Sequence, residues 1–136
     1  MLEELANEEI DLIVLPEMAL IGYRFNDRAD VEPFVESVPA DLTPIIEAID
    51  EREESKEDTA MPCTFKWALG VSKKFAPAWV AVGFAERDES DHYFNSAMVV
   101  NYNLRECHVV RKVLAYEDDL KWMNVEQAVS GIEYNF

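Results

Sequence analysis

Cysteine is scarce in this sequence, which has two, Cys63 and Cys107, among 136 residues. Two cysteines make no disulfide framework, and no Asn-x-Ser/Thr glycosylation site is present. Apolar runs stay well short of the ~20 residues of a membrane span. The first ten residues carry no base, so we expect no signal peptide. Together these absences favour a reducing compartment, and we expect a cytoplasmic location, with the nucleus as the alternative.

Basic residues are also few: 12 Lys and Arg stand against 28 Asp and Glu, giving a net charge of −16. A field of this sign repels phosphate backbones and anionic lipid, so we expect no nucleic-acid and no membrane partner. Most of the excess lies before residue 60, including an acidic run over 50–58. That run is typical of a solvated surface that aids solubility.

What is present is a globular composition, 49% hydrophobic and 11% aromatic, with a length that fits one domain. Apolar periodicity predicts helices over 2–7, 31–36, 43–49 and 64–76 and strands over 11–15, 78–84, 93–100 and 106–110. Thr64 is expected to cap the longest helix. The strand over 11–15 is apolar at four consecutive positions, which predicts burial on both faces. The order is that of an α/β protein with a mixed rather than purely parallel sheet.

Two polar side chains follow apolar strands. Glu17 comes directly after Pro16, and Lys112 follows Arg111 at the end of the last strand. Taken alone, an acid or a lysine at a strand end is ordinarily a solvated loop residue. The blocks around them carry a resemblance, however. Leu15-Pro-Glu-Met-Ala-Leu-Ile-Gly-Tyr23 resembles the glutamate motif of the nitrilase, or carbon–nitrogen hydrolase, superfamily.

Two further blocks extend this resemblance over most of the chain. Residues 64–84 resemble the helix and strand that follow the glutamate motif. Phe94-Asn-Ser-Ala97 with Val110-Arg-Lys112 resembles the hairpin that delivers the superfamily's lysine. The tail from Lys112 to Trp122 is most like the fungal protein N-terminal amidases. Two positions depart from the pattern: Val110 replaces an aromatic residue and Leu114 replaces a histidine.

The resemblance implies a fold and a domain. The fold is a partial nitrilase-type α-β-β-α sandwich, namely its N-terminal half, with a mixed sheet and flanking helices. Residues 1–136 would be a partial carbon–nitrogen hydrolase domain, truncated at both ends. A sheet left with an uncovered face and edge favours self-association.

The resemblance also implies a Glu-Lys-Cys mechanism without metal or cofactor. Glu17 would be the general base and Lys112 would stabilise the oxyanion. The nucleophilic cysteine of the family should follow the lysine, and no cysteine does. An auxiliary carboxylate could come from Glu117, Asp118 or Asp119, and the sequence does not choose among them.

The remaining candidates for chemistry have simpler explanations. Cys63 and Cys107 are expected to be small, partly buried thiols rather than nucleophiles. His92 and His108 show no metal-ligand spacing with the cysteines, so we expect no metal site.

The function predicted from the resemblance is that of a segment of an amide hydrolase. Its substrate would be an amide, with protein N-termini bearing Asn or Gln as the specific expectation. The isolated chain is expected to be inactive because the nucleophile is missing. The alternatives are a non-catalytic remnant that acts as a binding module, and a truncated gene product without function.

Overall fold

A mixed sheet forms the centre of the computed structural model, which describes residues 9–38, 62–76 and 78–126. Within these residues the strand order is β1-β3-β4-β5, and β2 pairs with the far end of β3. The elements are β1 (Leu12–Val14), α1 (Arg28–Val31), η1 (Glu32–Phe34), β2 (Glu36–Ser37), α3 (Cys63–Lys74), β3 (Trp79–Arg87), β4 (Tyr93–Asn101), β5 (Glu106–Arg111) and η2 (Asp119–Lys121).

Both kinds of strand pairing occur, as the sequence predicts. β1 and β2 run parallel to β3, whereas β3, β4 and β5 form an antiparallel meander. The α/β class with a mixed sheet and a flanking helix is therefore confirmed. The helices predicted over 2–7 and 43–49 lie outside the described residues.

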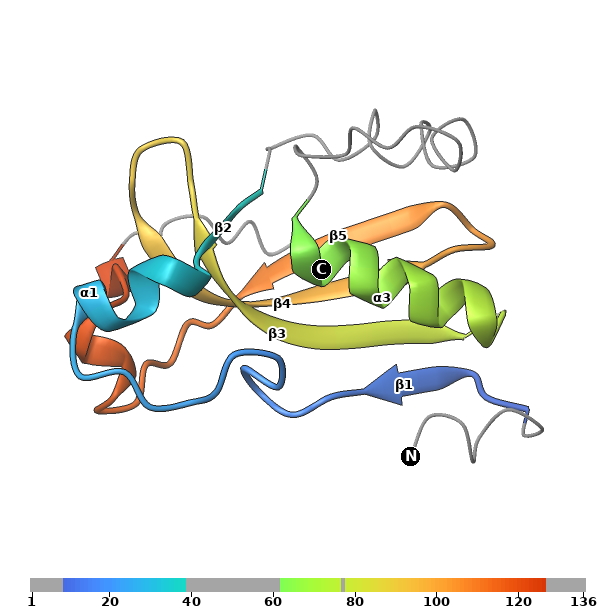
Figure 1. Ribbon diagram of the computed structural model, residues 1–136, viewed down its shortest axis with the longest axis horizontal. Helices are drawn as coiled ribbons and strands as arrows, with labels where there is room; N and C mark the ends of the chain where they lie inside the picture. The colour runs from blue at the N-terminus through green and yellow to red at the C-terminus, as the bar shows by residue number, and fades with distance from the viewer. Residues whose placement is uncertain (1–8, 39–61, 77, 127–136) are drawn as a thin grey trace.

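Helix α3 covers one face of the sheet (Figure 1). Its buried residues Phe65, Ala68 and Val71 pack on alternate residues of β3 and β4, among them Val82 and Met98. The apolar residues of the helix recur every three or four positions and form one face, which packs on the alternate residues that each strand turns toward it. Burial of these side chains forms the larger of two apolar clusters.

The helix start differs from the sequence prediction. Pro62 is the N-cap residue of α3, and the helix begins at Cys63 rather than after Thr64. The carboxylate of Glu36, from β2, accepts hydrogen bonds from the Thr64 backbone N–H and hydroxyl. A capping side chain 28 positions upstream has no local sequence signal. An earlier turn also differs: α1 begins at Arg28, not residue 31, because the side chain of Asp27 caps it.

The opposite face of the sheet is open in the described part of the chain, so the prediction that the first strand is buried on both faces is wrong. Leu12 and Val14 of β1 are 56% and 67% exposed, and Val110 of β5 is 58% exposed. Ile13, which points to the α3 side, packs against the core instead. The strand is fully apolar, yet the described residues provide a helix for one face only.

A second apolar cluster lies at one end of the sheet, where the loop after β1, α1 and the η2 turn come together (Figure 1). Met18, Phe25 and Trp122 are buried there against Tyr93 and Phe94 at the start of β4. The ring of Phe25 meets that of Trp122 edge to face at 6.0 Å. This cluster holds two loops, from opposite ends of the described chain, over the same end of the sheet.

Candidate active site

Glu17 stands on a tight turn that lies directly on β3. Met18 takes a positive φ of 52°, and the backbone N–H groups of Ile21 and Gly22 both donate to its carbonyl. A Cβ on Gly83 would lie 2.7 Å from the Met18 backbone N and 3.1 Å from the Glu17 Cα. Glycine at position 83 is therefore what lets the turn approach the strand so closely. The buried side chain of Met18 anchors the turn in the second apolar cluster.

Lys112 continues β5 by one residue, because its backbone N–H donates to the Asn95 carbonyl at 2.7 Å. Side chains alternate along a strand, so Arg111 and Lys112 point to opposite faces. On the α3 side, the Arg111 guanidinium makes several hydrogen bonds to the buried carboxylate of Glu86 and lies 3.8 Å above the Phe94 ring. The hydrogen bond to Glu86 raises the pKa of Arg111. The Ser96 hydroxyl also donates to Glu86.

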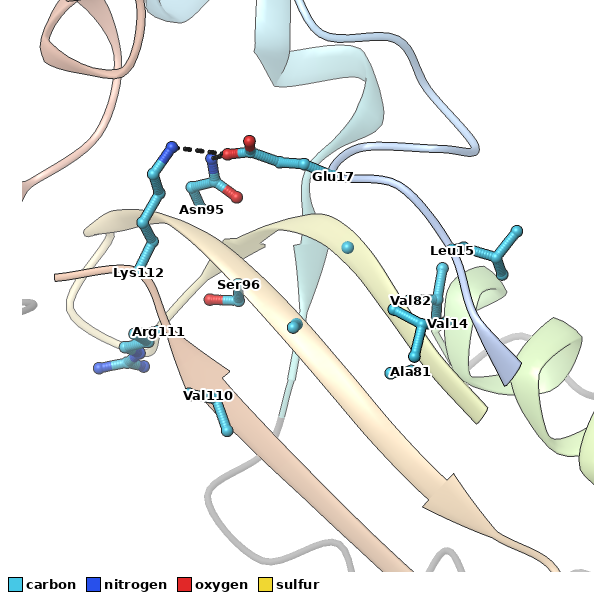
Figure 2. A pocket seen from close by; sticks show the side chains of 12 residues that line it. Val14, Leu15, Glu17, Ala81, Val82, Asn95, Ser96, Val110, Arg111 and Lys112 are labelled. Atoms are coloured by element: carbon cyan, nitrogen blue, oxygen red, sulfur yellow. Dashed lines mark hydrogen bonds and ion pairs between the residues drawn. The ribbon is translucent and has the colours of Figure 1, made fainter. Parts of the chain in front are cut away.

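On the open side, four polar side chains meet; we call them the carboxylate–lysine cluster: Glu17, Asn95, Lys112 and Asp119. The Lys112 Nζ lies 2.7 Å from Glu17 Oε1 and 2.7 Å from Asp119 Oδ2. The Asn95 side-chain amide donates to Glu17 Oε1 and, at 3.0 Å, to Asp119 Oδ1. Figure 2 shows Glu17, Asn95 and Lys112 converging from three separate segments.

Burial differs sharply within this cluster. Asp119 is 4% exposed at its side chain, whereas Glu17 is 37% exposed and Lys112 26%. Burial raises the pKa of Asp119, but hydrogen bonds from Lys112, the Tyr116 N–H and Asn95 outweigh it and hold that pKa below its usual value. Burial likewise lowers the pKa of Lys112, and the two carboxylates overcome this effect and raise it. The lysine is therefore a firmly charged ammonium at neutral pH.

An open groove of about 350 Å³ leads along the sheet to this cluster. Its floor is apolar and made of short side chains on four neighbouring strands, namely Val14, Ala81, Ala97 and Val110. Val14, Ala81 and Val110 are labelled in Figure 2. Glu17, Asn95 and Lys112 line its polar end. An apolar groove that ends in a few convergent polar groups is the usual form of a small-substrate site.

The geometry brings together the two residues singled out in the sequence, Glu17 and Lys112, across 95 positions. It also separates the three candidate acids. Asp119 is the one that contacts Lys112, whereas Asp118 pairs with Lys121 and Glu117 is exposed. Asn95 was not predicted as a site residue. Its signal was a buried amide within a largely apolar strand, which calls for polar partners.

Neither cysteine lies in the groove. Cys63 is exposed at the first turn of α3, and Cys107 is on the α3 side of β5, where burial raises the pKa of its thiol to about 12. His92 binds Asp88 in a turn, and His108 stacks on Trp79. Among the described residues, no group of His, Cys, Asp and Glu has the arrangement of a metal site. No helix in this part of the chain has the length and apolarity that crossing a bilayer requires.

Comparison with known proteins gives a consistent result. No family model matches the chain. It is 30% identical over 112 residues to a protein N-terminal amidase of Saccharomyces cerevisiae, and 25% identical over 120 residues to that of Schizosaccharomyces pombe. Crystal structures of N-terminal amidase with an Asn-Glu-Ala or a Gln-Val peptide superpose with a TM-score of 0.61 at 28% identity.

The match covers most of this chain and a small part of each relative. It includes 82% and 86% of the chain for the two yeast proteins, but 20% and 35% of their own lengths. For the crystal structures the shares are 85% of this chain and 22% of theirs. Fold and sequence together place the chain in the nitrilase, or carbon–nitrogen hydrolase, superfamily. Within it, the chain is similar to the protein N-terminal amidases over part of the domain.

Proposed function

We propose that this chain provides the general base and the oxyanion-stabilising lysine of a carbon–nitrogen hydrolase that deamidates Asn or Gln at protein N-termini. The observation that carries the proposal is the contact between Lys112 Nζ and Glu17 Oε1 at 2.7 Å at the end of an apolar groove. Similar proteins whose structures contain Asn- or Gln-initiated peptides support this choice of substrate.

Glu17 is suited to move protons. Both of its hydrogen bonds in the described residues are to Oε1, so Oε2 is available to a reacting group. In the proposed sequence Glu17 takes the proton of a thiol, and the thiolate attacks the side-chain amide carbon. Glu17 then passes that proton to the leaving nitrogen as the C–N bond breaks and ammonia departs. Water attacks the thioester, gives a proton to Glu17, and the thiol leaves with it, so that a carboxylic acid remains.

Lys112 is suited to the negative charge that forms on the amide oxygen. Its ammonium is fixed by Asp119 from one side and Glu17 from the other, and a fixed cation needs no reorganisation as charge develops. One well-placed donor of this kind is worth about 3–4 kcal/mol in the transition state. In this proposal Asp119 is the auxiliary carboxylate, which orients the lysine.

The thiol of this mechanism has to come from outside the described residues. Cys63 is exposed at the first turn of α3, which covers the opposite face of the sheet, and Cys107 lies on that same face with a raised pKa. We further propose, as the sequence suggests, that the protein works in the cytoplasm or nucleus.

A chimera tests the proposal. The matching fifth of the Saccharomyces cerevisiae amidase is replaced by this chain, so that the relative supplies the rest of the site. Ammonia release from Asn-initiated and Gln-initiated peptides is then compared with release from Asp-initiated ones. We expect turnover that Glu17→Gln and Lys112→Met each reduce at least about 100-fold, with Glu89→Gln, an exposed acid, as the matched control.

Turnover that survives Glu17→Gln would contradict the assignment of the base. A folded chimera that releases no ammonia would favour the second candidate function, a binding module without catalysis. The exposed apolar face around Leu12, Val14 and Val110 is the observation behind that alternative.

A further inference from the structure

Asn95, like Lys112, touches every other member of the carboxylate–lysine cluster. It lies on β4, is 3% exposed, and pairs with Ala85 of β3. Its backbone carbonyl accepts the N–H of Lys112 at 2.7 Å. Its side-chain NH₂ contacts Glu17, 78 positions upstream, and Asp119, 24 positions downstream. One residue on a central strand thus joins three loop or strand-end segments.

The chemistry of the amide explains how it does this. A primary amide has two N–H donors on one nitrogen. Here one is used for each carboxylate, so the two acids are held at a fixed separation. With a single lysine between them, two carboxylates leave one uncompensated negative charge, and their repulsion would otherwise push them apart. A neutral double donor supports both anions without competing with Lys112 for them.

We propose that Asn95 is the positioning residue of the cluster: its NH₂ group holds Glu17 and Asp119 on either side of the Lys112 ammonium and fixes Oε1 as the bound oxygen of Glu17. Oε2 is then the oxygen presented to the groove. The relevance to catalysis rests on the proposed function. The positioning itself is a property of the folded chain and is measured without turnover.

The first test is NMR of the ¹⁵N-labelled chain. Both N–H protons of Asn95 bind carboxylates, so we expect their resonances to move as Asp119 titrates and to exchange slowly with solvent. The side-chain amide of Asn103, which is exposed on the β4–β5 turn, is the internal control. Asn95 resonances that do not respond to the titration of Asp119, or that exchange as fast as those of Asn103, would overturn the proposal.

The second test uses Asn95→Ala, with carboxyl ¹³C detection of Asp119. Loss of the donor should shift the pKa of Asp119 upward and narrow the difference between the environments of the two Glu17 oxygens. Asn101→Ala is the matched control. Asn101 is also buried on β4 and on the same face, and its side-chain Oδ1 accepts the Leu104 N–H at 2.9 Å. Both variants should lose stability, but Asn101→Ala should leave the titration of Asp119 in place.

If Asn95 has a merely structural role, Asn95→Ala and Asn101→Ala should lose equal stability, and neither should change the titration of Asp119. Should Asn95→Ala fail to fold, the titration of the Asn95 amide in the unaltered chain still decides. An inactive chimera with a titrating Asn95 amide would refute the amidase but not the positioning. An active chimera in which the Asn95 amide does not respond to the titration of Asp119 would refute the positioning but not the amidase.

Discussion

Gly83→Ala is expected to lower the stability of the fold and to disturb the contact between Glu17 and Lys112 together. The added Cβ would lie 2.7 Å from the Met18 backbone N, whereas ordinary contact begins at 3.4 Å. The Glu17–Met18 backbone must therefore move by about 0.7 Å, because the obstructing atoms are not the end of a flexible side chain. Overpacking of this kind costs about 1–3 kcal/mol. The turn also carries Glu17, so the same movement should lengthen its 2.7 Å contact with Lys112.

Gly70→Ala is the matched control, and it should act with the opposite sign. Gly70 is exposed within α3, and a Cβ there meets nothing within 4 Å. Alanine in place of glycine inside a helix is expected to stabilise by about 0.5–1 kcal/mol. Urea unfolding measured by circular dichroism gives both values, and the slope of the transition should stay constant. In thermal scans the difference corresponds to about 4 °C per kcal/mol for a chain of this size.

Unfolding of Gly83→Ala at the same urea concentration as the unaltered protein would refute this prediction. A Gly83→Ala variant that loses stability while the titration of Lys112 remains unchanged would contradict the expected movement of the Glu17 turn. That result would mean that the strand, rather than the Glu17 turn, absorbs the added methyl group.

Three further predictions concern charge and thiol chemistry. Lys112→Met should destabilise the chain by about 2–3 kcal/mol at neutral pH, since buried Asp119 loses its cation. The lowered pKa of Asp119 stabilises the fold above the usual carboxyl range, and this contribution disappears as the pH falls through the folded value. The raised pKa of Lys112 stabilises the fold at every pH below the usual lysine range. This stabilisation is lost as the pH rises through the pKa of Lys112 in the folded state. We therefore expect the free energies of unfolding in urea of the unaltered protein and of Lys112→Met, measured from pH 3 to 7, to converge in acid. A difference that stays constant over this range would contradict the prediction. Glu86→Gln should lower the free energy of unfolding by about 2–4 kcal/mol, because Arg111 then loses its buried partner. The control Glu106→Gln, at an exposed position, should change it by no more than about 0.5 kcal/mol. Equal urea midpoints for the two variants would refute this prediction. Cys63 should react with a thiol reagent at pH 8 at least about tenfold faster than Cys107, whose pKa is raised to about 12 by burial. Mass spectrometry of the labelled chain measures both rates. Equal rates would count against the burial of Cys107.

The sheet was largely predictable because its strands follow local rules. Apolar runs bounded by Pro16 and by polar turns located β1, β3, β4 and β5, and the repeat of three and four located α3. The cap of α3 was missed because Glu36 reaches it from a distant strand. The exposure of Leu12 and Val14 was also missed, because a fully apolar strand does not reveal how many of its faces are covered.

The candidate site was predictable in part. Motif resemblance singled out Glu17 and Lys112, and the geometry brings them into contact; their catalytic roles stay predictions. Asp119 could not be separated from Asp118 by sequence, since neighbouring acids in a loop differ only in which way the turn points them. Asn95 was overlooked because a single amide in a strand has many structural explanations, and its partners lie far away in sequence.

The pairing of Arg111 with Glu86 has a consequence for how β5 can be aligned with β4. In the observed register Ser96 faces Arg111, and the next residue, Lys112, points the other way. A slip of one residue would turn Lys112 toward Glu86 and send Arg111 into the groove. The bidentate match of guanidinium and carboxylate penalises that slip, because an ammonium cannot reproduce it. If β5 shifted by one residue to absorb an insertion in the β4–β5 turn, the two cations would exchange faces, whereas a shift of two would return each to its own face. The Arg111–Glu86 pair therefore favours the observed alignment of the hairpin, and it lies on the side of the sheet away from the groove.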